Sequence, residues 1–439
     1  MRLSVKQIGL TNIDVRISVR HSQNYGKYSN LTGLRMSKQQ KFDTGKHFCV
    51  LPWIHMHVWA NGNTYPCCLS TYEYKVGNTN EKSFKELWNS EKMCTMRKNM
   101  LDDKPTEGCK KCYDIEENNG VSMRMNTNKS FSHHIERKEL TNRDGSVDDV
   151  FMSYMDIRFS NICNFKCRSC GPEFSSLWYD DAIAQGRWSS KESKIFRVKD
   201  TITELWDDMN QWIDTVEQIY FAGGEPLIMD EHYKILEHLI EIGRTDINIS
   251  YNTNLSKLKY KSKDVIELWK KFEHVTVGAS LDDSGARAEL MRSGTKWKDI
   301  ISNRKRILEE APHVKFSLTP TVSVFNVQHC IDFFDEWIYN GLVDTQLIEI
   351  NTLVHPDYLS AQILPKSVRK ETQNKIREFL IRHNMQDNDN YSSFTSLISF
   401  LDNDKQHLLP NYITYNDKLD AMRNESVMTT FPELGCLYE

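Results

Sequence analysis

Between residues 150 and about 355, short apolar runs alternate with helical patterns. Runs rich in β-forming residues stand at 150–160, 217–223, 247–253, 274–281, 314–322 and 347–353. Between them, apolar residues recur every three to four positions, as at 230–243 and 295–310, which predicts amphipathic helices. Such alternation is typical of parallel strands joined by right-handed crossovers. Six units are too few for a closed eight-stranded barrel, so we expect an α/β fold with an open, partial barrel at 150–360.

The rest of the chain divides by composition. Residues 1–46 carry nine Lys or Arg against two Asp, which predicts a solvated basic arm or, alternatively, a contact with an acidic partner. Residues 47–130 hold six of the eleven cysteines and predict a small Cys-rich module. Residues 131–149 are polar and indicate a linker. Residues 361–439 contain amphipathic pieces and predict a helical extension that covers the open side of the barrel.

The overall charge is nearly balanced, at a formal net −4. Because the neutralisation of phosphates needs a basic excess, this balance argues against a nucleic-acid partner. No apolar run approaches the length of a transmembrane helix, so we expect no membrane partner. The start of the chain lacks the apolar core of a secretory signal. We therefore expect a cytoplasmic protein, in which clustered cysteines are metal ligands or catalytic groups more often than disulfides.

Three cysteines, Cys163, Cys167 and Cys170, crowd into eight residues just after the first expected strand. A structural zinc site normally closes with four ligands. A 4Fe–4S cluster held by three thiolates leaves one iron without a protein ligand, and that iron can bind a small molecule. The spacing therefore indicates a working iron–sulfur cluster at the carboxyl end of the first strand.

The second expected strand ends in the sequence AGGEP. Gly223 and Gly224 remove side chains where a ligand must approach the backbone, and they permit positive φ. Glu225, before Pro226, presents a carboxylate that can pair with an ammonium group. A tight turn is the alternative interpretation. The position of the AGGEP sequence after a strand, 53 residues beyond Cys170, favours a binding loop.

Together, the CxxxCxxC and GGEP motifs resemble the signature of the radical S-adenosylmethionine (SAM) superfamily. The resemblance covers about 150–355 and implies a partial (β/α)6 barrel in which Cys163, Cys167 and Cys170 hold a 4Fe–4S cluster. It also implies that the open iron chelates SAM, and that an electron from the cluster cleaves SAM to a 5′-deoxyadenosyl radical, which abstracts a substrate hydrogen.

Further SAM-binding residues follow from the same resemblance. The third strand's end offers Asn252, Thr253 and Asn254 to the SAM ribose or the substrate. After the fourth strand, Ser280 and Arg292 are candidate contacts to the SAM carboxylate or ribose. Each of these residues could instead be an ordinary loop or cap residue. The sequence departs from the family at Ser169, where an aromatic residue usually packs on adenine.

Four further cysteines predict a second metal site. Cys49-x12-Gly62-x4-Cys67 spans an expected β-hairpin about Asn61–Asn63, and Cys109-x2-Cys112 follows a helical stretch. This pattern is similar to the twitch or SPASM module of radical SAM enzymes, which implies one auxiliary 4Fe–4S cluster held by Cys49, Cys67, Cys109 and Cys112. Structural zinc is the alternative metal, and Cys68 is the rival to Cys67. The module usually follows the barrel, whereas here it precedes it.

These features predict a radical SAM enzyme, of an oxidoreductase or peptide-modifying type, with an auxiliary cluster. The resemblance implies a reductant such as flavodoxin or ferredoxin. We expect a peptide or protein side chain as substrate, and a small polyol or nucleotide is the alternative. A non-catalytic zinc-binding protein is the alternative from another class, with zinc in both cysteine sets.

Overall fold

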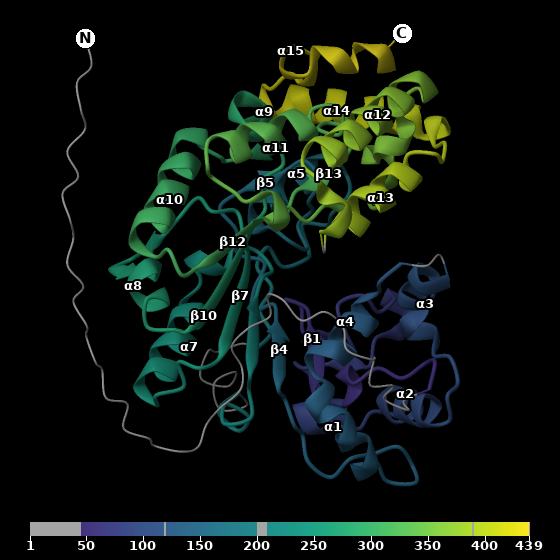
Figure 1. Ribbon diagram of the computed structural model, residues 1–439, viewed down its shortest axis with the longest axis vertical. Helices are drawn as coiled ribbons and strands as arrows, with labels where there is room; N and C mark the ends of the chain where they lie inside the picture. Colours follow the sequence, from purple (N-terminus) through teal and green to yellow (C-terminus); the bar gives the residue numbers. More distant parts are fainter. Residues whose placement is uncertain (1–44, 118–119, 200–208, 389, 439) are drawn as a thin grey trace, which may run out of the picture. The chain divides into compact units, whose positions relative to one another are not determined.

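The computed structural model describes residues 45–117, 120–199, 209–388 and 390–438. Its central feature is a sheet of eight strands, shown in Figure 1, with the order β12-β10-β7-β6-β4-β1-β2-β3. Five of these strands come from the expected barrel and are parallel to their neighbours: β4 (Tyr154–Ile157), β6 (Gln218–Phe221), β7 (Asn248–Thr253), β10 (His274–Ala279) and β12 (Lys315–Leu318). The expected runs of β residues therefore become the strands of a parallel sheet.

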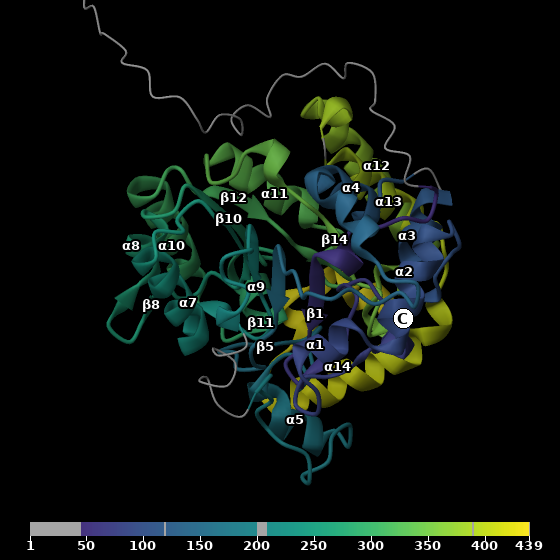
Figure 2. The ribbon, with the colours of Figure 1, turned by 90° about the horizontal axis from the view of Figure 1, so that it is seen from below.

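Helices cover one face of this parallel sheet, as Figures 1 and 2 show. They are α7 (Asp230–Glu241), α8 (Val265–Trp269), α10 (Trp297–Glu310) and α11 (Cys330–Tyr339), with α9 (Gly285–Met291) and the hairpin β8 (Lys259–Tyr260) and β9 (Lys263–Asp264) between them. Alternate strand residues point to this face: Tyr251 packs on Trp269 of α8, and Phe316 stacks on Trp337 of α11. The periodicity in the sequence thus marks the core face of each strand and helix.

The opposite strand face, here called the inner face, is polar. Because successive side chains of a strand point to opposite sides, the residues between the core positions share it. These residues are half-buried rather than buried: Gln218, Tyr220, Ser250, Asn252, Thr276 and Ser317. The inner face is therefore a polar surface that stays accessible from outside.

The sixth barrel unit is much reduced. After β12, the chain continues as β13 (Thr321–Val322), which pairs in parallel with β14 (Asn351–Thr352). A single bridge between Leu318 and Ile348 adds to this pairing. The sixth expected strand, at 347–353, is thus present only as the two-residue strand β14 and the single bridge at Ile348. The expectation of an α/β fold with an open, partial barrel is confirmed.

The N-terminal cysteine-rich segment joins the same sheet. The expected hairpin is present as β1 (His55–Val58) and β2 (Asn63–Tyr65), followed by β3 (Gly77–Asn78). Gly62 in its turn has φ +80°, and a Cβ there would lie 2.5 Å from Asn78 Oδ1, so glycine is needed. Strand β1 also pairs in parallel with β4 over four residues, which the sequence did not predict.

The remaining N-terminal elements are helices. They are α1 (Phe84–Trp88), α2 (Glu91–Leu101), α3 (Lys110–Glu117) and α4 (Met123–Ser130), followed by the 3-10 helix η4 (Ser132–Leu140). Helix α1 begins with a capping box between Ser83 and Glu86. Helix η4 occupies much of the polar segment expected to be a linker, and it buries Ile135. The proposed domain boundaries stay predictions, but the sheet itself runs across the boundary before residue 150.

The C-terminal segment is helical, as its pattern indicated. It contains α12 (Lys366–Arg382), α13 (Tyr391–Phe400), α14 (Leu409–Arg423) and α15 (Val427–Thr430). Helix α14 lies against the loop that follows β4, which includes β5 (Lys166–Cys167), paired with β11 (Arg292–Ser293), and is followed by α5 (Tyr179–Ala184). Tyr415 donates its hydroxyl to the carbonyl of Arg168 at 2.6 Å, and Arg423 Nη1 donates to the carbonyl of Lys166 at 2.9 Å. Within the described residues, no helix is both long and apolar enough to cross a membrane.

Arg168 carries the strongest part of this contact. Its guanidinium, 1% exposed, binds Asp420 of α14 and, at 2.7 Å, Glu425, while Asn416 accepts from Nη1 at 3.2 Å. A buried charge that loses its partners is strongly destabilising. We therefore expect the double substitution Asp420→Ala and Glu425→Ala to lower the free energy of unfolding by about 3–5 kcal/mol, measured by urea unfolding.

The matched control is Asp417→Ala. Asp417 lies on the same helix but is exposed, and it accepts a 3.2 Å hydrogen bond from the hydroxyl of Tyr438. Its loss should change the free energy of unfolding by no more than about 0.5 kcal/mol. If the double variant were as stable as this control, α14 would not be held by Arg168.

Candidate active site

Cys163, Cys167 and Cys170 lie together in the loop after β4. The pairing of β5 with β11 sets Cys167 opposite Arg292, and the amide of Cys170 donates to the Cys167 carbonyl at 3.0 Å. The Cys167 and Cys170 side chains share a hydrogen bond, which lowers the pKa of Cys167 and raises that of Cys170. Burial raises the pKa of Cys163 to about 12, and the neighbouring Cys167 acts in the same direction. The loop thus brings its three thiols into one electrostatic neighbourhood.

The loop is fixed on both sides by buried hydrogen bonds. Trp178 donates its indole N–H to the carbonyl of Cys167 at 2.8 Å, and Ser175 Oγ donates to the carbonyl of Phe165 at 2.5 Å. The amide of Phe165 donates to Cys163 Sγ at 3.4 Å. These hydrogen bonds fix the backbone of the loop that carries the three thiols.

The Gly223–Glu225 turn after β6 packs directly on this loop. Gly223 and Gly224 have φ +78° and +49°, in the left-handed region. A Cβ on Gly224 would lie 2.2 Å from the carbonyl oxygen of Ile162, so no other residue fits. The amide of Glu225 donates to that same carbonyl at 2.8 Å. The two motifs are therefore parts of one structure, which their separation in sequence does not show.

The Glu225 carboxylate is buried, at 1% exposed, and joins two strand ends. Oε1 accepts from Thr253 Oγ1 at 2.7 Å and from the Leu227 amide at 3.0 Å, and Oε2 accepts from the Asn254 amide at 2.7 Å. Burial raises its pKa to about 7, although the hydrogen bonds from Asn254 and Thr253 act in the opposite direction. A carboxylate has about four acceptor positions, so one remains. The remaining acceptor position suits a cationic donor, because a positive charge would offset the cost of burying the Glu225 carboxylate.

The expected residues after β7 connect to the same loop. Asn254 Nδ2 donates to Asn164 Oδ1 at 3.0 Å, next to Cys163. The hydroxyl of Thr253 donates to Glu225 and does not face an open site. Asn252 is half-buried on the inner face. Ser280 and Ser169 are half-buried as well, and the Ser280 amide donates to the carbonyl of Thr253. The strand ends thus converge on the three cysteines.

Arg292 is held by an aspartate that sequence reasoning missed. Its Nε and Nη2 donate to Asp282 at 2.7 and 2.9 Å, and its Nη1 lies 3.9 Å from Cys167 Sγ. Asp282 also accepts from the Thr321 amide at 2.8 Å. The expected contact to a SAM carboxylate is therefore left to Nη1 and the second hydrogen of Nη2. The doubled aspartate after the fourth strand was the available signal for this pairing.

A buried polar network lies where β1 meets β4. His57 Nδ1 is 2.9 Å from Asp156 Oδ2, and Arg158 Nε donates to Asp156 Oδ1 at 2.9 Å. Burial raises the pKa of Asp156, but the charges of Arg158 and His57 outweigh it and hold the pKa well below its usual range. The Arg158 guanidinium lies over the ring of Tyr220 on the inner face, at 5.0 Å. This network depends on the β1–β4 pairing, so the sequence could not indicate it.

The N-terminal cysteines surround one cavity. Cys49, Cys67, Cys109 and Cys112 line it, with the apolar or cationic side chains of Leu51, Leu69, Met123 and Arg124 and the backbone of Gly108. Burial, with neighbouring thiols of the set acting in the same direction, raises the pKa of Cys49 to about 11 and that of Cys67 to about 12. Cys68 instead donates its thiol to Met123 Sδ at 3.7 Å and does not line the cavity. The donor set is four thiols, which fits a 4Fe–4S cluster or zinc.

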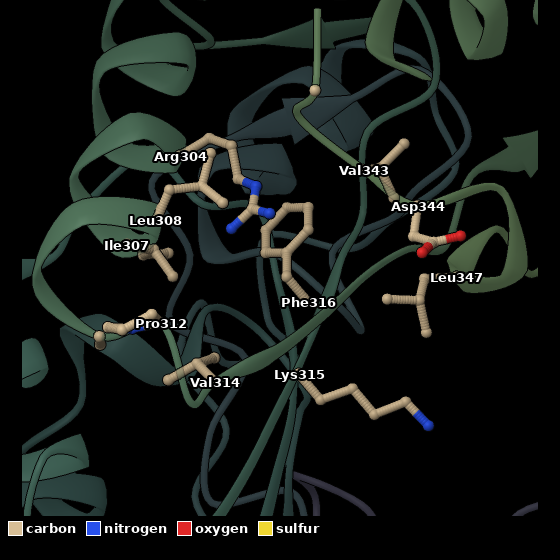
Figure 3. Close-up of a pocket in the computed structure, with 12 residues that line it drawn as sticks. Arg304, Ile307, Leu308, Pro312, Val314, Lys315, Phe316, Val343, Asp344 and Leu347 are labelled. Atoms are coloured by element: carbon tan, nitrogen blue, oxygen red, sulfur yellow. The ribbon is translucent and has the colours of Figure 1, made fainter. Parts of the chain in front are cut away.

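A cavity of about 380 Å³ lies elsewhere, between α10 and β12, and Figure 3 shows its lining. Arg304 lies over the ring of Phe316 at 3.9 Å and donates Nε to the carbonyl of Leu342 at 2.6 Å. None of the expected site residues lines this cavity. It sits beside Lys315 at the start of β12, away from the strand ends that carry the cysteines.

Comparison with known proteins identifies two families. Residues 157–335 match the radical SAM superfamily, and residues 49–113 match an iron–sulfur cluster-binding domain of the SPASM type. None of the curated proteins matches the chain.

Among solved structures, the chain is similar to "Native anSMEcpe with bound AdoMet", with 16% identity and a TM-score of 0.38 over 54% of this chain and 62% of that one. It is also similar to "Structure of TYW1 with a lysine-pyruvate adduct bound", with 13% identity and a TM-score of 0.29 over 54% and 71%. The chain spans about three fifths of the anSMEcpe chain.

The matched ranges contain both cysteine sets and the Gly223–Glu225 turn. Residues 157–335 are thus a radical SAM domain and residues 49–113 a SPASM iron–sulfur domain, and these domains imply a 4Fe–4S cluster, SAM and an auxiliary cluster as cofactors.

Proposed function

We propose that Cys163, Cys167 and Cys170 hold the SAM-binding cluster and that the Gly223–Glu225 turn binds SAM beside it. The observation that carries this proposal is the hydrogen bond from the Glu225 amide to the Ile162 carbonyl, one residue before Cys163. Because this bond joins the two motifs, a ligand bound at the cysteines also reaches the turn. When bound, the cluster supplies the electron that cleaves SAM to a radical able to abstract a substrate hydrogen.

The protein's own part in this chemistry is to bind and orient SAM. The free acceptor position of Glu225 suits the methionyl ammonium, and a charge-assisted bond there would offset the burial of its carboxylate. Arg292 Nη1, aimed toward Cys167, suits the methionyl carboxylate. Gly223, Gly224 and Pro226 shape the turn, and Asn252, Thr253, Asn254 and Ser280 line the neighbouring strand ends.

We further propose that Cys49, Cys67, Cys109 and Cys112 hold the auxiliary cluster. Their common cavity supports this ligand set, and the contact of Cys68 with Met123 supports Cys67 over Cys68. Burial and the charge of Asp156 in β4 raise the pKa of Cys68, and the charge of Arg158, which directly follows β4, lowers it. The auxiliary site is therefore one residue away from the polar network beside the inner face.

The inner face supports a substrate that is only partly enclosed. Small-molecule sites normally bury most of their ligand, whereas Ser250, Asn252, Thr276 and Ser317 remain half-buried. A peptide or protein segment can present one polar side chain to such a surface and leave the rest outside. Arg158 lies close to Gly223, because a Cβ added at Gly223 would be only 2.7 Å from the Arg158 Cβ. Its guanidinium is therefore a cationic group at the SAM end of this face. We therefore prefer a peptide or protein substrate to a polyol or nucleotide.

The basic arm at 1–46, which also bore on this preference, lies largely outside the described residues. The C-terminal extension packs on the cysteine loop, so its role is to support that loop. A reductant such as flavodoxin or ferredoxin and a cytoplasmic location remain part of the proposal.

Replacing Cys163, Cys167 and Cys170 together with alanine should abolish the reductive cleavage of SAM. The protein, reconstituted anaerobically and given a strong reductant, should release 5′-deoxyadenosine slowly even without substrate, and chromatography would quantify it. The variant should retain the auxiliary cluster because its ligands lie in another cavity. Continued release of 5′-deoxyadenosine by the variant would contradict the assignment of the SAM-binding cluster.

Glu225→Gln should weaken SAM binding by about one to two decades. It replaces a charge-assisted bond, which contributes roughly 1.5–3 kcal/mol, with a neutral one, and about 1.4 kcal/mol is a factor of ten in affinity. The affinity for SAM would be measured by equilibrium binding. The iron content would be measured alongside it and should not change. Glu241→Gln, on the exposed end of α7, is the control. Unaltered SAM affinity would reduce the turn to a structural element.

Replacing Cys109 and Cys112 with alanine should remove half of the iron. Two 4Fe–4S clusters predict about eight irons per chain, and the variant should keep about four. Cys68→Ala is the matched control and should keep all of it, because Cys68 does not line the cavity. Uncoupled SAM cleavage should largely survive in the double variant. If wild-type protein carried zinc at both sites, the non-catalytic alternative would be correct.

A further inference from the structure

A group of possible metal ligands lies at the opposite end of the sheet from the cysteines. His133 Nε2 is 2.8 Å from Glu217 Oε2, and His134 Nε2 is 2.6 Å from Glu217 Oε1. One ligand atom from each residue lies within 4.8 Å of the others. Glu217 immediately precedes β6 and Ser153 immediately precedes β4, whereas the cysteines and the Gly223–Glu225 turn follow these strands. The group is therefore separate from the proposed active site.

The three side chains are held by rigid parts of the fold. The amide of Glu217 donates to the carbonyl of Ser153, and its own carbonyl accepts from the amide of Asn248, so the sheet fixes its backbone on two sides. His134 packs edge-on against Phe151 at 5.2 Å and lies 3.1 Å from Ser153 Oγ. The two histidines are neighbours in η4, with ring centroids 4.1 Å apart. Preorganised donors of this kind favour binding because little order is lost.

The donor set suits a divalent transition metal. Two imidazole nitrogens and one carboxylate, with the remaining positions open, form the usual ligand set for Zn²⁺ and its neighbours in open sites. Zn–N and Zn–O bonds of about 2.0–2.2 Å put ligand atoms about 3–3.5 Å apart. The present separations of 2.6 and 2.8 Å would open by less than about 1 Å, and the remaining separation, within 4.8 Å, would close by less than about 2 Å, which small side-chain rotations can supply. The side chains of His133 and Glu217 are 39% and 40% exposed, so an ion can enter from solvent.

We propose that His133, His134 and Glu217 bind one Zn²⁺-type ion, with water completing its coordination. The ion ties η4, which follows the SPASM domain in the chain, to Glu217 at the amino end of β6. Its role is therefore to fix the cluster domain against the barrel. Hydrogen bonds between the two histidines and Glu217 are the competing explanation of the same geometry.

The test is a zinc count on protein whose cysteines are already filled with iron and sulfide. Protein reconstituted anaerobically would be exposed to a modest excess of Zn²⁺, desalted, and analysed for iron and zinc by mass spectrometry. Wild type should retain about one zinc per chain more than His133→Ala/His134→Ala, at equal iron content. Glu217→Gln keeps the size of the side chain and should weaken zinc binding at least tenfold, which covers the case in which the double variant does not fold.

His383→Ala is the matched control. His383 Nε2 lies 2.7 Å from Asp335, a carboxylate that it shares with Arg382, so this pair has one imidazole and a competing cation. The control should retain as much zinc as wild type. Equal zinc in wild type and the double variant would overturn the proposal, as would equal affinity in wild type and Glu217→Gln.

Discussion

The bond from the Glu225 amide to the Ile162 carbonyl is the contact on which the site depends. It requires a backbone without a Cβ at Gly224, because any side chain would collide with the same carbonyl. It brings the turn after β6 onto the cysteine loop after β4. The Glu225 carboxylate then extends the connection to Thr253 and Asn254 after β7. Three strand ends are thereby joined around one group of thiols.

The parallel pairing of β1 with β4 has a comparable effect on the auxiliary site. The SPASM domain precedes the barrel in this chain, yet its hairpin occupies the sheet position beside the first barrel strand. The pairing buries His57 against Asp156 and turns Asp156 toward Arg158. His57 and Asp156 are direct partners in the β1–β4 register, so the network lies where the two parts join. The C-terminal extension supports the cysteine loop from another side through Arg168.

Much of the fold could be predicted from the spacing of apolar residues along the chain. The strands within 150–322 and the helices at 230–241 and 297–310 lie where the apolar pattern put them, because each has one buried face. The motifs also indicated which strand ends carry chemistry. The β1–β4 pairing and the Arg168 contacts join residues far apart in the chain. Single-sequence patterns report local periodicity, and they contain no information on such partners. The sixth strand was overestimated because its apolar run packs as a loop and a two-residue strand.

The most direct test of the central claim is electron paramagnetic resonance of the anaerobically reduced protein, recorded with and without SAM. The account predicts signals from two 4Fe–4S clusters, of which one changes on addition of SAM because an open iron acquires a ligand. That change should be absent when Cys163, Cys167 and Cys170 are replaced. A protein that shows no iron–sulfur signal, or signals that SAM leaves unchanged, would contradict the account.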